Sequence, residues 1–143
     1  MMTLTQDRKM HEIKSVNTLI VHCSDTPDQE NISAKDIHNM HIGFGWNGIG
    51  YHKVINRDGM VENGRPEYWV GAHVKGKNHD TLGVCLIGRR KFTKEQFTSL
   101  ELVLKKWKKK YPNAQILGHY QSTDTKKTCP NFDVKKWAEE KNI

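Results

Sequence analysis

Two short apolar runs indicate strands that are buried on both faces. Residues 16–23 and residues 82–88 are nearly continuous in apolar side chains. Strands that are covered on both sides have this pattern, whereas half-exposed strands alternate between apolar and polar positions. Because successive side chains of a strand point to opposite faces, Ile20 and His22 share one face of the first strand. We therefore predict two central strands, with His22 at the carboxyl end of the first.

Three other stretches have the signals of helices. Ser33 precedes a run with apolar residues at helical spacing, and Asp36 stands where the acidic partner of a capping box belongs. Thr93 and Gln96 open a longer run in the same way, and that run closes in lysines before a proline. A short terminal helix is expected after Asp133.

The remaining pattern predicts a hairpin and a further strand. Asp58-Gly59 lies between strand-like residues 51–56 and 60–62, which is typical of a tight hairpin turn. Residues 114–117 form another apolar run, shortly before His119. Strands and helices that alternate in this irregular way favour a single α/β domain, with a mixed β-sheet flanked by helices, over residues 15–143. Residues 1–14 show no periodicity and are expected to form a flexible arm.

The charge of the chain favours an anionic partner. The formal net charge is +7, which suits nucleic acid, acidic lipid or an anionic cell-wall polymer. No recognised nucleic-acid-binding motif accompanies the charge, and no run approaches the ~20 apolar residues of a membrane span. The N-terminus lacks the apolar core of a secretory signal, so we expect a cytoplasmic protein. No apolar surface stripe indicates a dimer, and we expect a monomer.

Three side chains could together hold a metal ion. His119 is followed by a polar loop and then by Cys129, and His22 ends a predicted strand elsewhere in the sequence. Imidazole and thiolate ligands suit zinc, and three protein ligands with one open position are typical of catalytic zinc. Cys23 and Cys85 lie in apolar runs and are expected to be small buried residues. The odd number of cysteines argues against a disulfide framework.

Several short motifs together resemble one enzyme family. They are His22 after a strand, Gly50-Tyr51-His52, Arg57-Asp58-Gly59, Gly71-Ala72-His73, Gly83-Val84-Cys85-Leu86, and His119 followed by Lys127-Thr128-Cys129-Pro130. In order and spacing they resemble the type 2 N-acetylmuramoyl-L-alanine amidases, and most of all the small phage amidases. The peptidoglycan recognition proteins share this domain. The resemblance covers about residues 18–137, although the segment between His119 and Cys129 is somewhat longer than the phage pattern.

The resemblance assigns roles to specific residues. It places the zinc ligands at His22, His119 and Cys129, the same set that the spacing suggests. It also places Lys127 where an oxyanion would be stabilised, and Tyr51 where a side chain would orient the attacking water or help to move its proton. Without the resemblance, Tyr51 could equally be a packing residue and Lys127 an ordinary loop lysine.

Other residues are candidates for contact with substrate. His73 and Asn78 lie in a polar, glycine-containing segment that the resemblance places beside the substrate groove, and Trp46 is a candidate stacking wall. Each could instead serve packing or loop polarity. His52, His73 and His79 compete as metal ligands, but His52 should point away from Tyr51, and we expect it to be buried and hydrogen-bonded.

The resemblance implies a zinc-dependent hydrolase of bacterial peptidoglycan. Its expected substrate is the amide between N-acetylmuramic acid and L-alanine, and its expected setting is phage endolysis, after release from the host cytoplasm. Two alternatives remain at this point. The domain could be a peptidoglycan-binding module without catalysis, or it could bind and inhibit phage RNA polymerase through the arm at residues 1–14.

Overall fold

A mixed five-stranded sheet forms the centre of the molecule. The structure, a computed structural model, describes residues 11–143. The strands are β1 (Thr18–Cys23), β2 (Lys53–Ile55), β3 (Val61–Asn63), β4 (Thr81–Leu86) and β5 (Gln115–Gly118), in the spatial order β3-β2-β4-β1-β5. Only β3 is antiparallel to its neighbour. The predicted α/β domain with a mixed sheet is confirmed, as are the two central strands and the hairpin.

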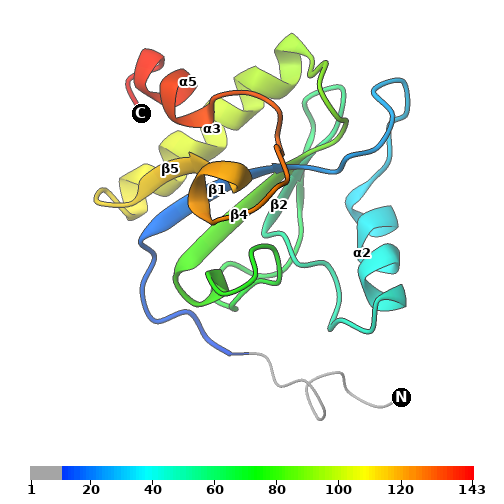
Figure 1. The fold of residues 1–143 in the computed structure, drawn as a ribbon, viewed down its shortest axis with the longest axis horizontal. Coiled ribbons are helices and arrows are strands. Elements are labelled where there is room, and N and C mark those ends of the chain that lie inside the picture. Colours follow the sequence, from blue (N-terminus) through cyan, green and yellow to red (C-terminus); the bar gives the residue numbers. More distant parts are fainter. Residues whose placement is uncertain (1–10) are drawn as a thin grey trace.

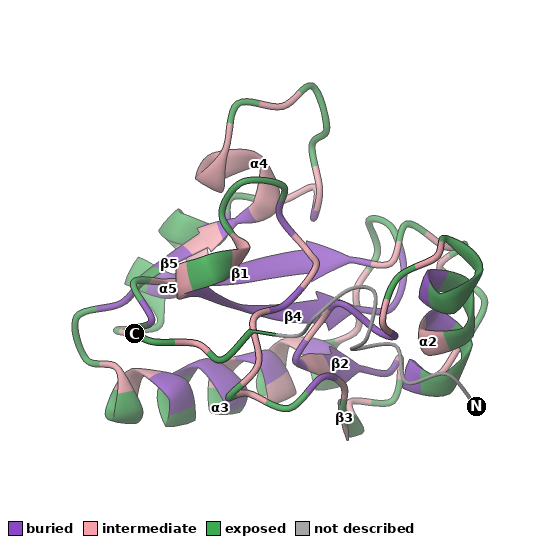
Figure 2. Cartoon of the chain, turned by 90° about the horizontal axis from the view of Figure 1, so that it is seen from below, coloured by how far each residue is buried: buried purple, intermediate pink, exposed green. Residues whose placement is uncertain are grey.

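Helices cover the sheet, and their capping signals are as the sequence predicts. The helices are α2 (Ala34–Gly43), α3 (Lys94–Lys110), α4 (His119–Ser122) and α5 (Val134–Glu140), with a 3₁₀ turn, η1 (Asn78–Asp80). Figure 2 shows α3 along one face of the sheet and α4 beyond the opposite face. Ser33 and Thr93 both form capping boxes, with Asp36 and Gln96. Within residues 11–143, no helix has the length and apolarity needed to cross a membrane.

The two faces of the sheet have different partners because side chains alternate along each strand. On one face, Leu19 and Val21 of β1 belong to the main core together with Leu100 and Leu104 of α3. On the other face, a smaller core forms beneath α2; its residues are Ala34, Ile37, Ile49, Val54, Cys85 and Ile87. His22 follows the alternation and lies on this second face, away from α3, as predicted.

Parallel β1 and β5 end at the same edge of the sheet, and this edge collects the chemically interesting residues. Thr18–Val21 of β1 pair in register with Gln115–Gly118 of β5, so His22 and His119 each follow directly on the paired segments. The sequence predicted that His119 ends the strand and that a loop follows, but β5 ends at Gly118 and His119 opens the single-turn helix α4 (Figure 1). Gln121 Oε1 accepts a hydrogen bond from Gly118 N, and this contact closes the turn.

The first part of the chain is only partly described. Residues 1–10, most of the predicted arm, lie outside the described residues. Residues 11–13 lie against the domain: Glu12 forms an isolated antiparallel bridge with Trp69, Val70 N donates to His11 O, and Ile13 N donates to Tyr68 O. This pairing fixes residues 11–13 to the domain, so the segment at 11–14 is not entirely a free arm.

Candidate active site

A large cavity opens at the carboxyl edge of β1. Its volume is about 1100 Å³, and its walls come from the end of β1, the segment around η1, and the segment after α4. The residues to which the sequence assigned a role in metal binding, catalysis or substrate contact all line it: His22, Trp46, Tyr51, His73, Asn78, His119, Lys127 and Cys129. Residues that are distant in the sequence therefore line one cavity, because the carboxyl ends of the parallel strands lie at the same edge of the sheet.

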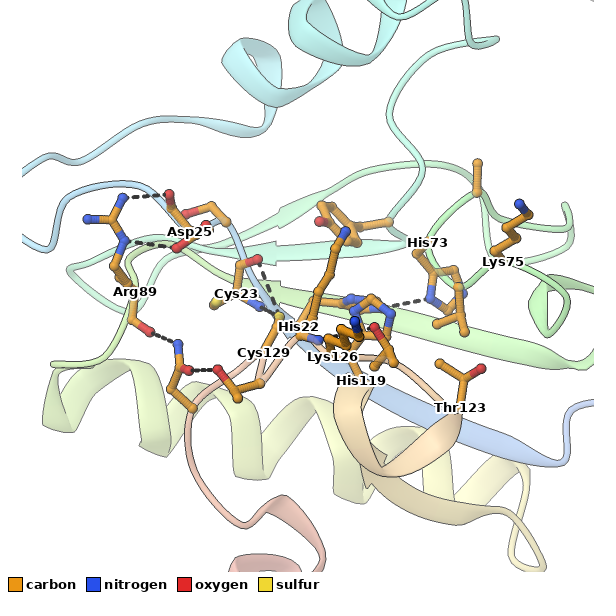
Figure 3. A pocket seen from close by; sticks show the side chains of 18 of the residues that line it. His22, Cys23, Asp25, His73, Lys75, Arg89, His119, Thr123, Lys126 and Cys129 are labelled. Carbon is orange, nitrogen blue, oxygen red and sulfur yellow. Dashed lines mark hydrogen bonds and ion pairs between the residues drawn. The ribbon is translucent and has the colours of Figure 1, made fainter.

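The three predicted metal ligands meet in space. One potential ligand atom each from His22, His119 and Cys129 lies within 4.8 Å of the others. Figure 3 shows the three side chains converging from the end of β1, from α4 and from the segment after it. Two imidazoles and one thiol form the donor set of a catalytic zinc site. The residues present therefore fit a zinc ion.

The hydrogen bonds of His22 and Cys129 leave His22 Nδ1 and Cys129 Sγ able to bind a metal. His22 Nε2 lies 2.8 Å from His73 Nδ1, so Nδ1 of His22 is the nitrogen left for coordination. Cys23 N donates to Cys129 Sγ at 3.0 Å, a bond that favours a thiolate. His22 is only 2% exposed. Burial and, secondarily, the neighbouring His73 hold the pKa of His22 well below its usual value, which keeps the imidazole in its neutral, metal-binding form.

Two further cysteines lie nearby in buried positions. Cys23 and Cys85 are buried, as predicted. Contact with the Cys23 thiol, followed by burial, raises the pKa of the Cys129 thiol. A metal cation opposes both effects, because it stabilises the thiolate directly. Cys129 is therefore suited to ionise together with metal binding.

Tyr51 lies beside the metal ligands. Its ring centroid is 5.0 Å from that of His22. Burial, and then the surrounding thiols of Cys85 and Cys129, raise the pKa of the Tyr51 phenol well above its usual value. Tyr51 therefore keeps its proton and can donate a hydrogen bond into the cavity. β2 begins only at Lys53, so Tyr51 and His52 precede the strand in which the sequence placed them.

Lys127 supplies a positive charge to the same chamber. It is exposed and lines the cavity, as does its neighbour Lys126. The two lysines differ in their effect on the ligands. Burial is the largest cause of the lowered pKa values of His22 and His119. The charge of Lys127 contributes to both, and for His22 it ranks after the neighbouring His73 and His119. Lys127 is therefore the lysine whose charge acts on the ligand cluster.

His52 has the structural role that the sequence predicted. It is 1% exposed. Its Nε2 donates to Trp69 O at 2.8 Å and its Nδ1 accepts from Gly83 N at 3.1 Å, so neither nitrogen is available to a metal. His79 lies on the surface beside Asp80, with 3.7 Å between His79 Nε2 and Asp80 Oδ1. Neither histidine joins the ligand set.

The three predicted substrate residues line the cavity in different ways. Trp46 is 38% exposed and stands beside the His41 ring, with 4.5 Å between centroids. Both ring nitrogens of His73 are already hydrogen-bonded. Asn78 Oδ1 accepts from the backbone N–H groups of His73 and Val74, each at 2.8 Å. Asn78 thus fixes the backbone of the His73 segment.

Some residues at the site were not anticipated from the sequence. Arg89 and Arg90 line the far end of the cavity, where Arg89 Nε donates to Asp25 Oδ1 at 2.8 Å (Figure 3). Thr81, the first residue of β4, contacts His73 through its hydroxyl. A polar residue at the start of a buried apolar run was the only sequence signal for Thr81.

Comparisons with known proteins agree with this geometry. Residues 12–132 match the family described as N-acetylmuramoyl-L-alanine amidase. The endolysin of Escherichia phage T7 is 38% identical over 138 residues, which cover 91% of this chain and 90% of the relative. The endolysin of Enterobacteria phage T3 is 37% identical, with coverage of 90% and 89%.

Solved structures give the same result. The N-acetylmuramoyl-L-alanine amidase LysC from Clostridium intestinale superposes with a TM-score of 0.83 at 29% identity, covering 94% of this chain and 90% of its own. The Drosophila peptidoglycan recognition protein LB superposes with a TM-score of 0.75 at 25% identity, covering 91% and 84%. Both the sequence and the fold therefore place this chain beside amidases and recognition proteins.

Proposed function

The chain belongs to the N-acetylmuramoyl-L-alanine amidase family, and we propose that it is a zinc-dependent hydrolase of bacterial peptidoglycan. This membership confirms the resemblance that its motifs predict. The proposed substrate bond is the amide between N-acetylmuramic acid and the L-alanine of the stem peptide. Because the chain resembles phage endolysins over nine-tenths of their length, we infer that it acts in host lysis.

The observation that carries this proposal is the convergence of His22, His119 and Cys129 in the wall of a large cavity. A three-residue set that opens on a cavity leaves a coordination position for chemistry, whereas structural zinc sites are closed by four protein ligands. A bound zinc ion supplies Lewis acidity, which polarises an amide carbonyl and makes water a better nucleophile at neutral pH. A module that only binds peptidoglycan has no need of this arrangement.

Two other side chains complete the chemistry. We assign to Lys127 the stabilisation of the negative charge that develops on the amide oxygen during attack by water. Tyr51 remains a neutral phenol in its partly buried position and donates a hydrogen bond that orients the attacking water or helps to move its proton. No side chain needs to act as a nucleophile, so no acyl-enzyme is expected.

Substrate passes along the cavity wall formed by Trp46, His73 and Asn78. Trp46 offers a partly exposed ring face that suits a sugar or an apolar part of the stem peptide. The nitrogens of His73 are occupied, so that His73 contributes shape rather than new hydrogen bonds. The net charge of +7 favours residence near an anionic cell wall.

The test is hydrolysis of purified peptidoglycan, measured as newly exposed N-terminal alanine. We expect activity that disappears when the metal is removed by a chelator and returns with zinc. Cys129→Ser should lose zinc and activity together, because a hydroxyl is a poor substitute for a thiolate ligand. Cys85→Ala, a change at a buried cysteine outside the ligand set, is the matched control and should keep both.

Two results would contradict the proposal. Wild-type protein that holds zinc but releases no alanine is not an amidase on this substrate. Protein that is fully active without metal does not use the site as described.

Binding to RNA polymerase stays a prediction. It was assigned to residues 1–14, and residues 1–10 lie outside the part of the chain that the structure describes. Deleting residues 1–8 tests it separately from catalysis, since the site residues begin at His22.

A further inference from the structure

We propose that Thr81 and His73 are positioning residues that set the tautomer and the ring orientation of the metal ligand His22. The inference rests on the proposed metal site and assigns to His73 a role that the sequence did not suggest. The chain of contacts runs from the carbonyl of Lys77 through Thr81 and His73 to His22.

The carbonyl of Lys77 determines which atom is the donor in each hydrogen bond of this series. A carbonyl oxygen can only accept, so the Thr81 hydroxyl donates its single proton to Lys77 O, at 2.9 Å. Thr81 Oγ1 is then an acceptor toward His73 Nε2, 3.1 Å away, and Nε2 of His73 must carry a hydrogen.

The tautomer of His73 in turn determines which nitrogen of His22 carries a hydrogen. With its hydrogen on Nε2, neutral His73 presents an unprotonated Nδ1 to His22. His22 Nε2, 2.8 Å away, therefore donates its hydrogen to His73. His22 is left with an unprotonated Nδ1, which is the form that binds a metal. Figure 3 shows this contact between the two rings, with His73 beyond His22 as seen from Cys129.

Two glycines make room for the His73 ring. A Cβ atom at Gly83 would lie 2.6 Å from His73 Nδ1, and one at Gly71 would lie 2.7 Å from His73 Cδ2. Both distances are too short for real Cβ contacts, so any larger residue at either position would displace the ring. The ring therefore lies in a slot that the backbone of β4 and the segment before it leave open.

The backbone of His73 is held as well. Asn78 Oδ1 accepts hydrogen bonds from the backbone N–H groups of His73 and Val74. Ring, backbone and both ring nitrogens of His73 are thus all constrained. A side chain fixed in this way serves to orient its neighbour, in the manner of the hydrogen-bond partners that orient metal-bound histidines elsewhere.

Thr81→Val tests the proposal, because valine has nearly the shape of threonine and lacks the hydroxyl. Without the hydroxyl, His73 Nε2 loses its contact with Thr81 Oγ1, and the tautomer that blocks Nδ1 of His22 becomes more accessible. We expect zinc affinity, measured by competition with a chromophoric chelator, to fall about 10- to 100-fold. Thr81→Ser keeps the hydroxyl and should bind zinc as the wild type does. Thr18→Val makes the same change at the residue paired with Thr81 on β1, and it should also leave affinity unchanged.

A second readout does not depend on metal or activity. Nitrogen-15 chemical shifts of the histidine rings in metal-free protein report which nitrogen carries the hydrogen. Wild type should show His22 and His73 both protonated at Nε2, and Thr81→Val should lose this uniform state. Wild-type spectra with the hydrogen of His22 on Nδ1, or wild-type zinc affinity in a folded Thr81→Val protein, would overturn the proposal.

These outcomes are separable from failure of the proposed function. If the wild type binds zinc but does not hydrolyse peptidoglycan, the amidase assignment fails. The zinc affinities of the Thr81 and Thr18 variants still show whether Thr81 positions His22. If the wild type binds no zinc, the metal site fails, and the ring spectra alone decide whether the chain of hydrogen bonds exists.

Discussion

At the scale of single residues, two adjacent lysines offer a direct test of the proposed role of Lys127. Lys126 and Lys127 are both exposed and both line the cavity. The charge of Lys127 contributes to the lowered pKa values of both His22 and His119, after burial as the largest cause. Its exposure means that its removal costs the fold little. The pair therefore allows the proposed role of Lys127 to be tested against a neighbouring lysine of the same charge.

We predict that Lys127→Ala lowers kcat/KM for amide hydrolysis by about 10²-fold or more, because an oxyanion would lose its stabilising cation. Zinc content and thermal stability should stay at wild-type levels. Lys126→Ala is the matched control, with the same change of charge one residue away, and its effect should be much smaller. Equal losses in the two variants would show that general charge, rather than a placed cation, matters here.

At the scale of elements, the N-terminus of α3 is joined to the sheet through one buried glutamine. Gln96 is 0% exposed. Its Nε2 donates to Ile87 O at 2.8 Å and to Ile55 O at 3.2 Å, and its Oε1 accepts from Thr93 N at 2.9 Å. Arg57 Nη1 also donates to Oε1, at 3.1 Å. The capping-box glutamine that the sequence predicts therefore also connects the start of α3 to the ends of β2 and β4.

We predict that Gln96→Ala lowers the free energy of unfolding by about 2–4 kcal/mol, since it leaves a cavity and several buried polar groups without partners. Urea denaturation of the metal-free protein measures the change. Glu95→Ala, one residue earlier in the same helical turn but exposed, should stay within about 0.5 kcal/mol of wild type. A small effect of Gln96→Ala would mean that water or the neighbouring side chains satisfy the carbonyls instead.

At the scale of the whole molecule, the fold holds several histidines in neutral form. Burial, as the largest cause, lowers the pKa of His52 from 6.5 to about 4 and that of His41 likewise to about 4. Both accept a backbone hydrogen bond, from Gly83 N and Gly50 N respectively, which requires an unprotonated nitrogen. His22 and His73 are lowered in the same direction. The folded state therefore binds fewer protons than the unfolded chain in acid.

The sign of the pH dependence follows from these lowered values. Their contribution to stability is complete above the unfolded value of 6.5 and is lost as pH falls toward about 4. For His52 alone, the shift corresponds to at most ~3 kcal/mol. We predict that the urea midpoint of metal-free protein drops markedly between pH 7.5 and pH 4.5. His41→Asn keeps an acceptor near the Nδ1 position but cannot titrate, so its midpoint should fall less. A midpoint that is flat over this range would contradict the prediction.

The sequence by itself determined the parts of this protein that depend on short-range pattern. Unbroken apolar runs identified β1 and β4, capping residues identified the starts of α2 and α3, and Asp58-Gly59 identified the hairpin. These features are local, because strand alternation, helix capping and turn chemistry act over a few residues. The set His22, His119 and Cys129 was also accessible, since each donor stands at the end of a predicted strand or in the polar segment beyond it.

Only the tertiary structure decided what depends on register and on long-range contact. It placed His119 at the start of α4 rather than at the end of a strand, joined residues 11–13 to residues 68–70, and brought His73 against His22. The pairing of Thr18 with Thr81 across β1 and β4 sets the position of Thr81 relative to His22, and His73 contacts both. No local pattern encodes that alignment, because it results from packing two faces of the sheet at once.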